Sequence, residues 1–119
     1  NDFEAVAHGI TELSDADLVQ IGGHEPIQNK AVGVLGAGTG LGVAGLLPTE
    51  SGYHVLDTEG GHADYSPIND LQSAVVDYLR GEFGRVSLER LLSGKGLLNI
   101  YSALCSIEEV PKIFLPLQK

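Results

Sequence analysis

A carboxylate and an imidazole stand close together in the segment Glu59-Gly60-Gly61-His62. A carboxylate accepts two hydrogen bonds side by side, which matches a vicinal diol, and an imidazole donates to or accepts from a neighbouring hydroxyl. The two glycines allow a tight turn that aims both side chains into one pocket. The pattern therefore fits a sugar site, and the plain alternative is a surface turn with a solvated Glu59 and an incidental His62.

The same region also offers potential metal ligands. Two histidines with a carboxylate suit zinc or iron. On an extended chain His62 and Asp64 would share a face, whereas His54 need not reach them. We therefore expect no metal held by these side chains, which are His54, Asp57, Glu59, His62 and Asp64.

A glycine-rich stretch runs from Gly36 to Gly42, between two apolar segments. Without Cβ atoms, its backbone N–H groups can point together at an anion, and Thr39 adds a hydroxyl donor. A nucleotide loop of the P-loop or Rossmann kind leads from a strand into a helix. Here Pro48 and the polar turn after it leave no room for a helix, so we expect an antiparallel hairpin. The structural alternative is a tight turn that binds nothing.

Three further residues have chemistry that sequence alone leaves open. Asp2 at the entry of a helix is either a cap or a general base. Glu89 lies in the first turn of a short helix, where the dipole favours an anion, and the plain alternative is a pairing with Arg90 or water. Cys105 is expected to be ordinary core or boundary.

The elements that must position these residues are predicted from the spacing of apolar residues and from the residues that start or end helices. We predict an α/β protein, α+β within this chain, in which a three-stranded meander carries helices on one side; this is about half of a ribonuclease-H-like domain or an isolated α+β fold. The predicted helices cover 2–11, 66–81 from a Ser66-Pro67 start, a short turn after Ser87, and 97–107 after an interruption at Gly94-Lys95-Gly96; the predicted strands are 18–21, 31–35, 43–47 and 53–56.

Composition excludes several classes of function. The 119 residues carry a net charge of −9, which argues against nucleic acid and against anionic membrane surfaces. With 43% apolar residues the chain is not disordered. There is one cysteine, no apolar run long enough to span a membrane and no signal peptide, so we expect a cytoplasmic protein.

Taken in order, five segments resemble bacterial-type glucokinases of the hexokinase/actin-like ATPase superfamily. The match runs over about residues 1–105 with nearly the same spacings, and the last fourteen residues resemble nothing we can place. The five segments are Asn-Asp-Phe-x-Ala-Val at the start, Leu-Val-Gln-Ile-Gly-Gly at 18–23, Gly-Ala-Gly-Thr-Gly-Leu-Gly-Val-Ala at 36–44, Glu-Gly-Gly-His-x-Asp-Tyr-x-Pro at 59–67 and Val-Ser-x-Glu-Arg-Leu-Leu-Ser-Gly-x-Gly-Leu-x-Asn-x-Tyr at 86–101.

The resemblance implies glucose as a partner and assigns its contacts. Asp2 would be the general base that takes the proton from the sugar 6-hydroxyl. Asn1, Glu59, His62 and Glu89 would hydrogen-bond the sugar hydroxyls. This division suits phosphoryl transfer, which depends on positioning and charge neutralisation.

The resemblance likewise implies ATP, with Mg²⁺ bound through the nucleotide. Gly38, Thr39 and Gly40 would face the ATP phosphates as the second phosphate loop of the family. The family's first phosphate loop, Asp-x-Gly-Gly-Thr, does not occur in these 119 residues. We therefore expect residues 1–119 to be a single partial domain, the first part of the large domain, cut from something longer and starting without Met.

Three expectations about the isolated chain follow. It should not phosphorylate glucose by itself, because an ATP site of this family closes between two domains. The alternative functions are a non-catalytic sugar-binding fragment and a self-associating fragment. Homodimer formation would cover apolar strand edges.

Overall fold

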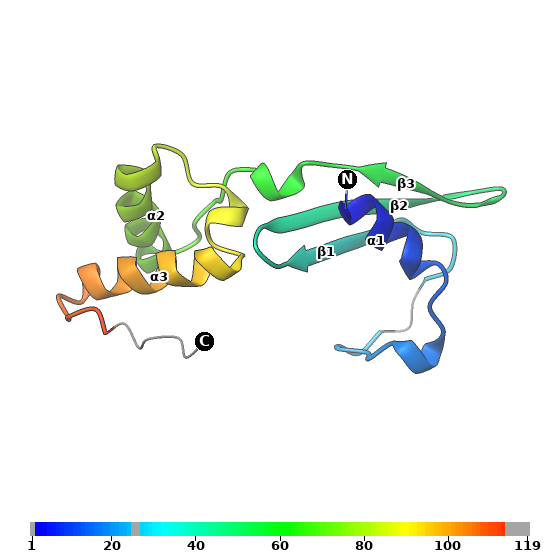
Figure 1. The fold of residues 1–119 in the computed structure, drawn as a ribbon, viewed down its shortest axis with the longest axis horizontal. Helices are drawn as coiled ribbons and strands as arrows, with labels where there is room; N and C mark the ends of the chain where they lie inside the picture. The colour runs from blue at the N-terminus through cyan, green and yellow to red at the C-terminus, as the bar shows by residue number, and fades with distance from the viewer. Residues whose placement is uncertain (1, 25–26, 114–119) are drawn as a thin grey trace. The chain divides into compact units, whose positions relative to one another are not determined.

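A computed structural model of the chain describes residues 2–24 and 27–113, and these form two compact units (Figure 1). The sheet unit holds the described residues from 2 to 36 and from 42 to 60. The helical unit holds residues 37–41 and the described residues from 61 to 113. Residues 37–41 of the glycine-rich stretch therefore belong to the helical unit, whereas Gly36 and Gly42 on either side belong to the sheet unit.

The sheet unit is an antiparallel meander with one helix. The strands β1 (Val32–Ala37), β2 (Leu41–Thr49) and β3 (Gly52–Asp57) follow one another across the sheet in the order β1-β2-β3. In the pairing of β2 with β3, Ala44 lies opposite Asp57 and Thr49 opposite Gly52. Gly52, the first residue after the two-residue turn Glu50-Ser51, has φ +127, a backbone conformation that favours glycine. The predicted three-stranded meander is confirmed.

Helix α1 (Asp2–Ile10) contacts β3 and contributes Phe3, Ala7 and Ile10 to this unit's core. The buried residues are Ala7, Val34, Ala44 and Leu46, with Phe3, Ile10 and Val55 packed against them. Phe3 lies against two glycines: a Cβ at Gly36 would stand 2.5 Å from its ring, and one at Gly42 would overlap the ring. Glycine at both positions thus lets the first turn of α1 pack on the two strands that flank the loop.

The helical unit is built from α2 (Asp70–Phe83) and α3 (Gly94–Ile107), which contact each other, and from two short 3-10 helices. Of these, η3 covers Leu88–Arg90, while η2 (Gly60–His62) begins at the last residue of the sheet unit. The core of this unit consists of Val75, Val76, Leu79, Val86, Leu91 and Ala103. It shares no residue with the core of the sheet unit.

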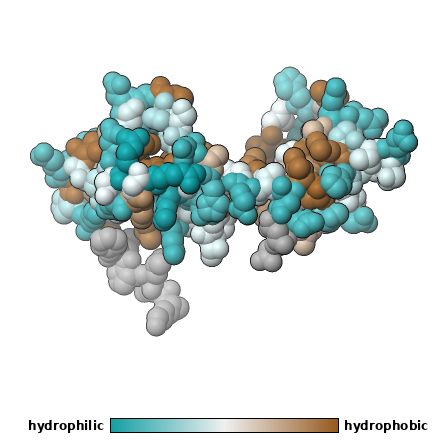
Figure 2. All heavy atoms as spheres, turned by 90° about the horizontal axis from the view of Figure 1, so that it is seen from above, coloured by the Kyte–Doolittle hydropathy of each residue, from teal (hydrophilic) through white to brown (hydrophobic). Residues whose placement is uncertain are grey.

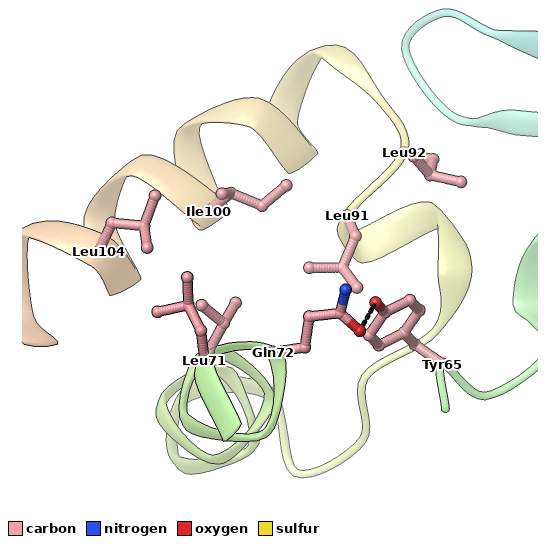
Figure 3. Close-up of a pocket in the computed structure, with 8 residues that line it drawn as sticks. Tyr65, Leu71, Gln72, Leu91, Leu92, Ile100 and Leu104 are labelled. Atoms are coloured by element: carbon pink, nitrogen blue, oxygen red, sulfur yellow. Dashed lines mark hydrogen bonds between the residues drawn. The ribbon is translucent and has the colours of Figure 1, made fainter. Parts of the chain in front are cut away.

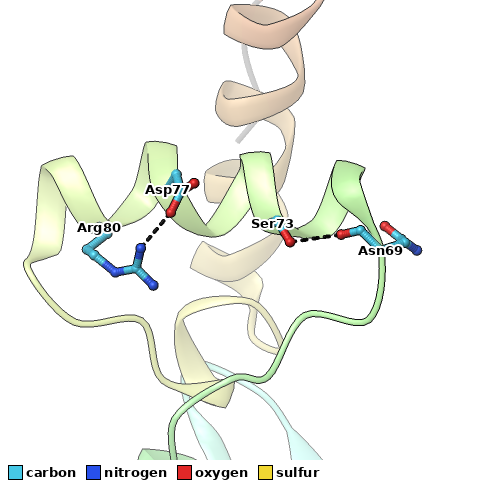
Figure 4. Close-up of polar contacts among 4 residues, drawn as sticks. All are labelled: Asn69, Ser73, Asp77 and Arg80. Carbon is cyan, nitrogen blue, oxygen red and sulfur yellow. Dashed lines mark hydrogen bonds and ion pairs between the residues drawn. The ribbon is translucent and has the colours of Figure 1, made fainter.

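Both long helices begin where the sequence did not predict. Helix α2 starts at Asp70, and the side chain of Asn69 accepts a hydrogen bond from the Gln72 N–H at 2.9 Å (Asn69 is drawn in Figure 4). The start predicted at Ser66-Pro67 is wrong, because Asn69 is the residue that satisfies a first-turn N–H. Helix α3 starts within the predicted interruption, since the Ser93 hydroxyl accepts from the Gly96 N–H at 2.9 Å.

Two predictions about extended segments also need correction. Residues 18–21 join none of the three strands, and Val19 and Ile21 are 87% and 96% exposed. Pro48 does not end its strand but lies within β2, opposite Tyr53.

In the described part of the chain, no helix is both long and apolar enough to cross a membrane.

Candidate functional site

The glycine-rich loop between β1 and β2 is a tight turn held by backbone hydrogen bonds. The N–H of Gly38 donates to the carbonyl of Gly40 at 2.8 Å. The carbonyl of Gly38 in turn accepts from the N–H of Gly94, the first residue of α3, also at 2.8 Å. The predicted hairpin is confirmed, and α3 begins directly against its turn.

Two amides of this turn point to no protein acceptor. Within the described residues, the N–H groups of Thr39 and Gly40 donate no hydrogen bond to the protein. Thr39 is exposed. Adjacent backbone donors at a glycine turn suit an anion such as a phosphate.

Glu89 reaches the same loop from a position 48 residues further along the chain. Its Oε2 accepts a hydrogen bond from the Leu41 N–H at 2.9 Å, and the contact is partly buried. Arg90 instead places its guanidinium 4.2 Å from the centroid of the Phe83 ring. In place of the alternative pairing with Arg90 or water, the structure gives the Glu89 carboxylate a backbone partner in the loop.

A short antiparallel pairing joins the segment that follows His62 to the segment that precedes Glu89. Asp64 forms a bridge with Ser87, the Tyr65 N–H donates to the Val86 carbonyl at 3.1 Å, and the Leu88 N–H donates to the Ala63 carbonyl at 2.9 Å. His62 ends η2, directly before the paired residues of its segment, and Glu89 lies in η3, two residues after Ser87.

Arg85 fastens the His62 segment. Its Nε donates to Asp64 Oδ1 at 2.5 Å, and its Nη2 donates to the backbone carbonyl of His62. Asp64 is thus engaged by a cation. Among the described residues, no group of three His, Cys, Asp or Glu side chains is arranged to hold a metal ion, so the metal interpretation of this region has no support.

Gly61 allows the third close approach at the loop. A Cβ at this position would collide with the backbone oxygen of Leu41. The turn at 60–62 therefore lies directly against the end of the loop. Three segments far apart in the sequence meet there: the loop at 37–41, the turn that carries His62, and the η3 segment that carries Glu89.

Glu59 lies on the sheet side of this turn. It is exposed, between the end of β3 and η2. Thr58 holds the backbone beside it, since its hydroxyl donates to the Val43 carbonyl at 2.7 Å and accepts from the Gly60 N–H at 3.2 Å. Asp2 is the first residue of α1, next to Phe3, and its side chain lies outside the described part; Asn1 lies outside the described residues altogether.

An apolar cavity of about 310 Å³ lies between α2 and α3 (Figure 3). Its only polar side chains are Tyr65 and Gln72, whose hydroxyl and amide oxygen are already bonded to each other at 2.7 Å. A sugar requires several convergent polar groups, so this cavity does not suit one. Its lining is completed by Leu71, Val75, Leu91, Leu92, Ile100 and Leu104.

Sequence reasoning found the ligand-type side chains and missed the backbone groups that organise them. No pattern in a single sequence predicts these backbone contacts, which are the bond from the Gly94 N–H, the bond from the Leu41 N–H and the close approach at Gly61. The one available signal was the spacing Ser93-Gly94-Lys95-Gly96, which carries a cap residue three positions before a glycine N–H.

Comparison with known proteins identifies the family. A family model described as Glucokinase matches residues 1–118. The chain belongs to the glucokinase family. Among curated relatives, the glucokinase of Marinobacter nauticus is 48% identical over 110 residues, which cover 92% of this chain and 34% of the relative. The glucokinase of Zymomonas mobilis is 48% identical over 113 residues, covering 93% of this chain and 35% of the relative.

Solved glucokinases resemble the chain in structure as well. A crystal structure of glucokinase from an Antarctic psychrotroph matches with a TM-score of 0.86 at 34% identity, over 97% of this chain and 36% of that one. A glucokinase from Balamuthia mandrillaris in complex with glucose matches with a TM-score of 0.65 at 27% identity, over 72% of this chain and 26% of that one. The chain thus spans about a third of the length of these glucokinases.

Proposed function

We propose that this chain is the sugar-facing part of a glucokinase, which transfers the γ-phosphoryl group of ATP to the 6-hydroxyl of glucose. The observation that carries the proposal is the hydrogen bond between Glu89 and the Leu41 N–H, at 2.9 Å. Through this bond the Glu89 carboxylate, a group suited to binding sugar hydroxyls, contacts loop 37–41, whose glycines are typical of phosphate-binding loops. A phosphoryl-transfer site needs both functions at neighbouring positions, because donor and acceptor must meet in line.

Within this proposal the side chains divide into two groups. Asn1, Glu59, His62 and Glu89 hydrogen-bond the sugar hydroxyls, and Asp2 accepts the proton of the attacking 6-hydroxyl. A glucokinase crystallised with glucose is among the structures that the chain resembles. This likeness, together with the motifs, supports glucose as the sugar.

The nucleotide side rests on the loop. The N–H groups of Thr39 and Gly40 donate to no acceptor among the described residues, and with Gly38 they form the proposed cradle for the ATP phosphates. Mg²⁺ bound through ATP would neutralise charge on the transferred group.

The wider setting is also part of the proposal. The meander with its helices would be the first portion of the large domain of a ribonuclease-H-like, actin-like ATPase fold. The single buried cysteine, Cys105, suits a reducing cytoplasmic compartment, where glucokinase activity would feed glycolysis. Figure 2 shows apolar side chains at the surface, which suit self-association or a homodimer. Leu35, for example, is 72% exposed.

Glucose binding tests the sugar half. We expect calorimetry with the 119-residue chain to detect glucose, and His62→Ala to weaken binding about tenfold, as loss of one good hydrogen bond would. The matched control is His24→Ala, an exposed histidine outside the site, which should bind as the parent does. Equal binding by both variants would remove His62 from the site.

Activity tests the other half. We expect the 119-residue chain alone to give no glucose 6-phosphate in a coupled assay, because the first phosphate loop is not among its residues. Turnover by this chain that Asp2→Ala abolishes would contradict that expectation. Light scattering in the same buffer would separate a monomer from the self-associated form.

A further inference from the structure

We propose that Glu89 is a positioning residue for the phosphate loop as well as a sugar ligand: one carboxylate oxygen holds loop 37–41 in shape and the other is presented to the sugar. The first half stands on contacts within the helical unit. The second half rests on the proposed function. Together they make Glu89 the physical link between the sugar and the phosphoryl donor.

The first step is the direction of the hydrogen bond. Glu89 Oε2 accepts from the Leu41 N–H at 2.9 Å, so only one of the two carboxylate oxygens is committed to the loop. A carboxylate has about four lone-pair positions that accept hydrogen bonds, and the bond to Leu41 uses none of those on Oε1. A bond from a backbone N–H to an ionised acceptor is stronger than one between neutral groups.

The second step is steric. A Cβ at Gly40 would overlap Glu89 Oε2 and stand 3.1 Å from its Cδ. Glycine at this position therefore serves the approach of the carboxylate. At Gly38, two residues earlier, the space for a Cβ is open, so the requirement is specific to Gly40.

The third step is that the loop is held at both ends. The Gly38 carbonyl accepts from the Gly94 N–H at 2.8 Å, while Glu89 holds Leu41 at the other end. The N–H groups of Thr39 and Gly40 lie between these two attachments. Fixing both ends fixes the direction of the donors in the middle, as preorganised phosphate recognition requires.

The fourth step concerns charge. A carboxylate beside a phosphate loop would repel a nucleotide if its charge faced the loop unpaired. The Leu41 N–H offsets that charge on one oxygen, and a sugar hydroxyl would offset it on the other. Occupancy of the sugar site should therefore favour a loop ready for phosphate, which is a coupling between two ligands through one side chain.

The loop half is tested by hydrogen exchange of the Leu41 amide, followed by NMR in the 119-residue chain. We expect Glu89→Ala to speed exchange at Leu41 about ten- to a hundredfold, as loss of a hydrogen bond to a charged acceptor would. Glu89→Gln keeps an acceptor oxygen and should restore most of the protection. The control is Glu82→Ala, an exposed glutamate on α2, which should leave Leu41 unchanged.

A double-mutant cycle tests the same contact from the glycine side. Gly40→Ala should speed exchange at Leu41 while Glu89 is present and should have little further effect in Glu89→Ala. Gly33→Ala on β1, where the Cβ space is open, is the matched control. Unchanged exchange in Glu89→Ala, or equal effects of Gly40→Ala in both backgrounds, would overturn the proposal.

The sugar half has a separate readout. On addition of glucose, the Leu41 amide resonance should shift in the parent chain and stay in place in Glu89→Ala. Glucose that binds by calorimetry without moving Leu41 would overturn the coupling. Absence of any glucose binding would instead overturn the proposed sugar function and, with it, the coupling, while the exchange data would still decide whether Glu89 holds the loop.

Discussion

The site depends on three glycines at which a neighbouring segment approaches the backbone closely: Gly40, Gly61 and Gly94. At Gly40 and Gly61 the space of a Cβ is taken by a Glu89 oxygen and by the Leu41 carbonyl. At Gly94 the backbone N–H bonds the loop. These three glycines therefore act as places where another segment makes contact.

The first prediction concerns Gly61. We expect Gly61→Ala to lower the free energy of unfolding by about 1–3 kcal/mol, because the added methyl meets a backbone oxygen, which cannot rotate away. Thermal or urea denaturation measures the change.

Gly81 supplies the matched control. It lies inside α2, and a Cβ there would meet nothing within 4 Å. Gly81→Ala should therefore raise stability by about 0.5–1 kcal/mol through helix propensity alone. If Gly61→Ala were stabilising as well, the close approach to Leu41 would be wrong.

At this scale the sequence identified candidates and not their partners. Glu89 and His62 could be chosen because their chemistry suits a sugar, and because the family motif contains them. The acceptor role of Glu89 towards Leu41 could not be chosen, since 48 residues separate the two and one of the partners is a backbone group.

Among the elements, the strands were the most predictable and the helix starts the least. Alternating or apolar runs with glycine turns identify β1, β2 and β3 from local sequence. The start of α2 was missed because Asn69, three residues after Ser66, caps the helix, and because the Ile68 N–H donates to the Gln72 side chain at 2.9 Å. Side-chain bonds to these backbone groups could not be read from the sequence.

The second prediction concerns the start of α2. The exposed face of this helix carries Asn69, Ser73, Asp77 and Arg80 (Figure 4). We expect Asn69→Ala to cost about 1 kcal/mol of stability, because the Gln72 N–H loses its acceptor. Urea denaturation gives the value.

Asp77→Ala is its control. It breaks the ion pair with Arg80, whose N–O distance is 2.5 Å between side chains that are 71% and 58% exposed. An exposed pair of this kind contributes under about 0.5 kcal/mol on a helix. Equal losses for Asn69→Ala and Asp77→Ala would mean that the cap contributes nothing special.

At the scale of the whole molecule, the described residues form two units, and each unit has its own hydrophobic core. Leu46 is buried in the sheet unit and Leu79 in the helical unit, at 2% and 0% exposure. Neither unit could be recognised from sequence, because their boundaries fall at Gly36, Leu41 and Gly60, inside motifs that read as continuous.

The third prediction follows from this division. Leu79→Ala should reduce hydrogen-exchange protection of α2 and α3 by an amount that corresponds to about 2–5 kcal/mol, with a smaller effect on the strands. Leu46→Ala should do the reverse. Equal loss of protection throughout the chain in both variants would show that the two cores unfold as one.

The passage of residues 37–41 through the helical unit has a consequence for inheritance. No single crossover between two related genes can exchange the helical unit intact, because its segments are interrupted by residues 42–60. A recombinant joined at Gly60 would combine one parent's loop with the other parent's Glu89 and Gly94. Substitutions in the loop should therefore be inherited together with those at 61–96, and less strictly with those in the strands on either side.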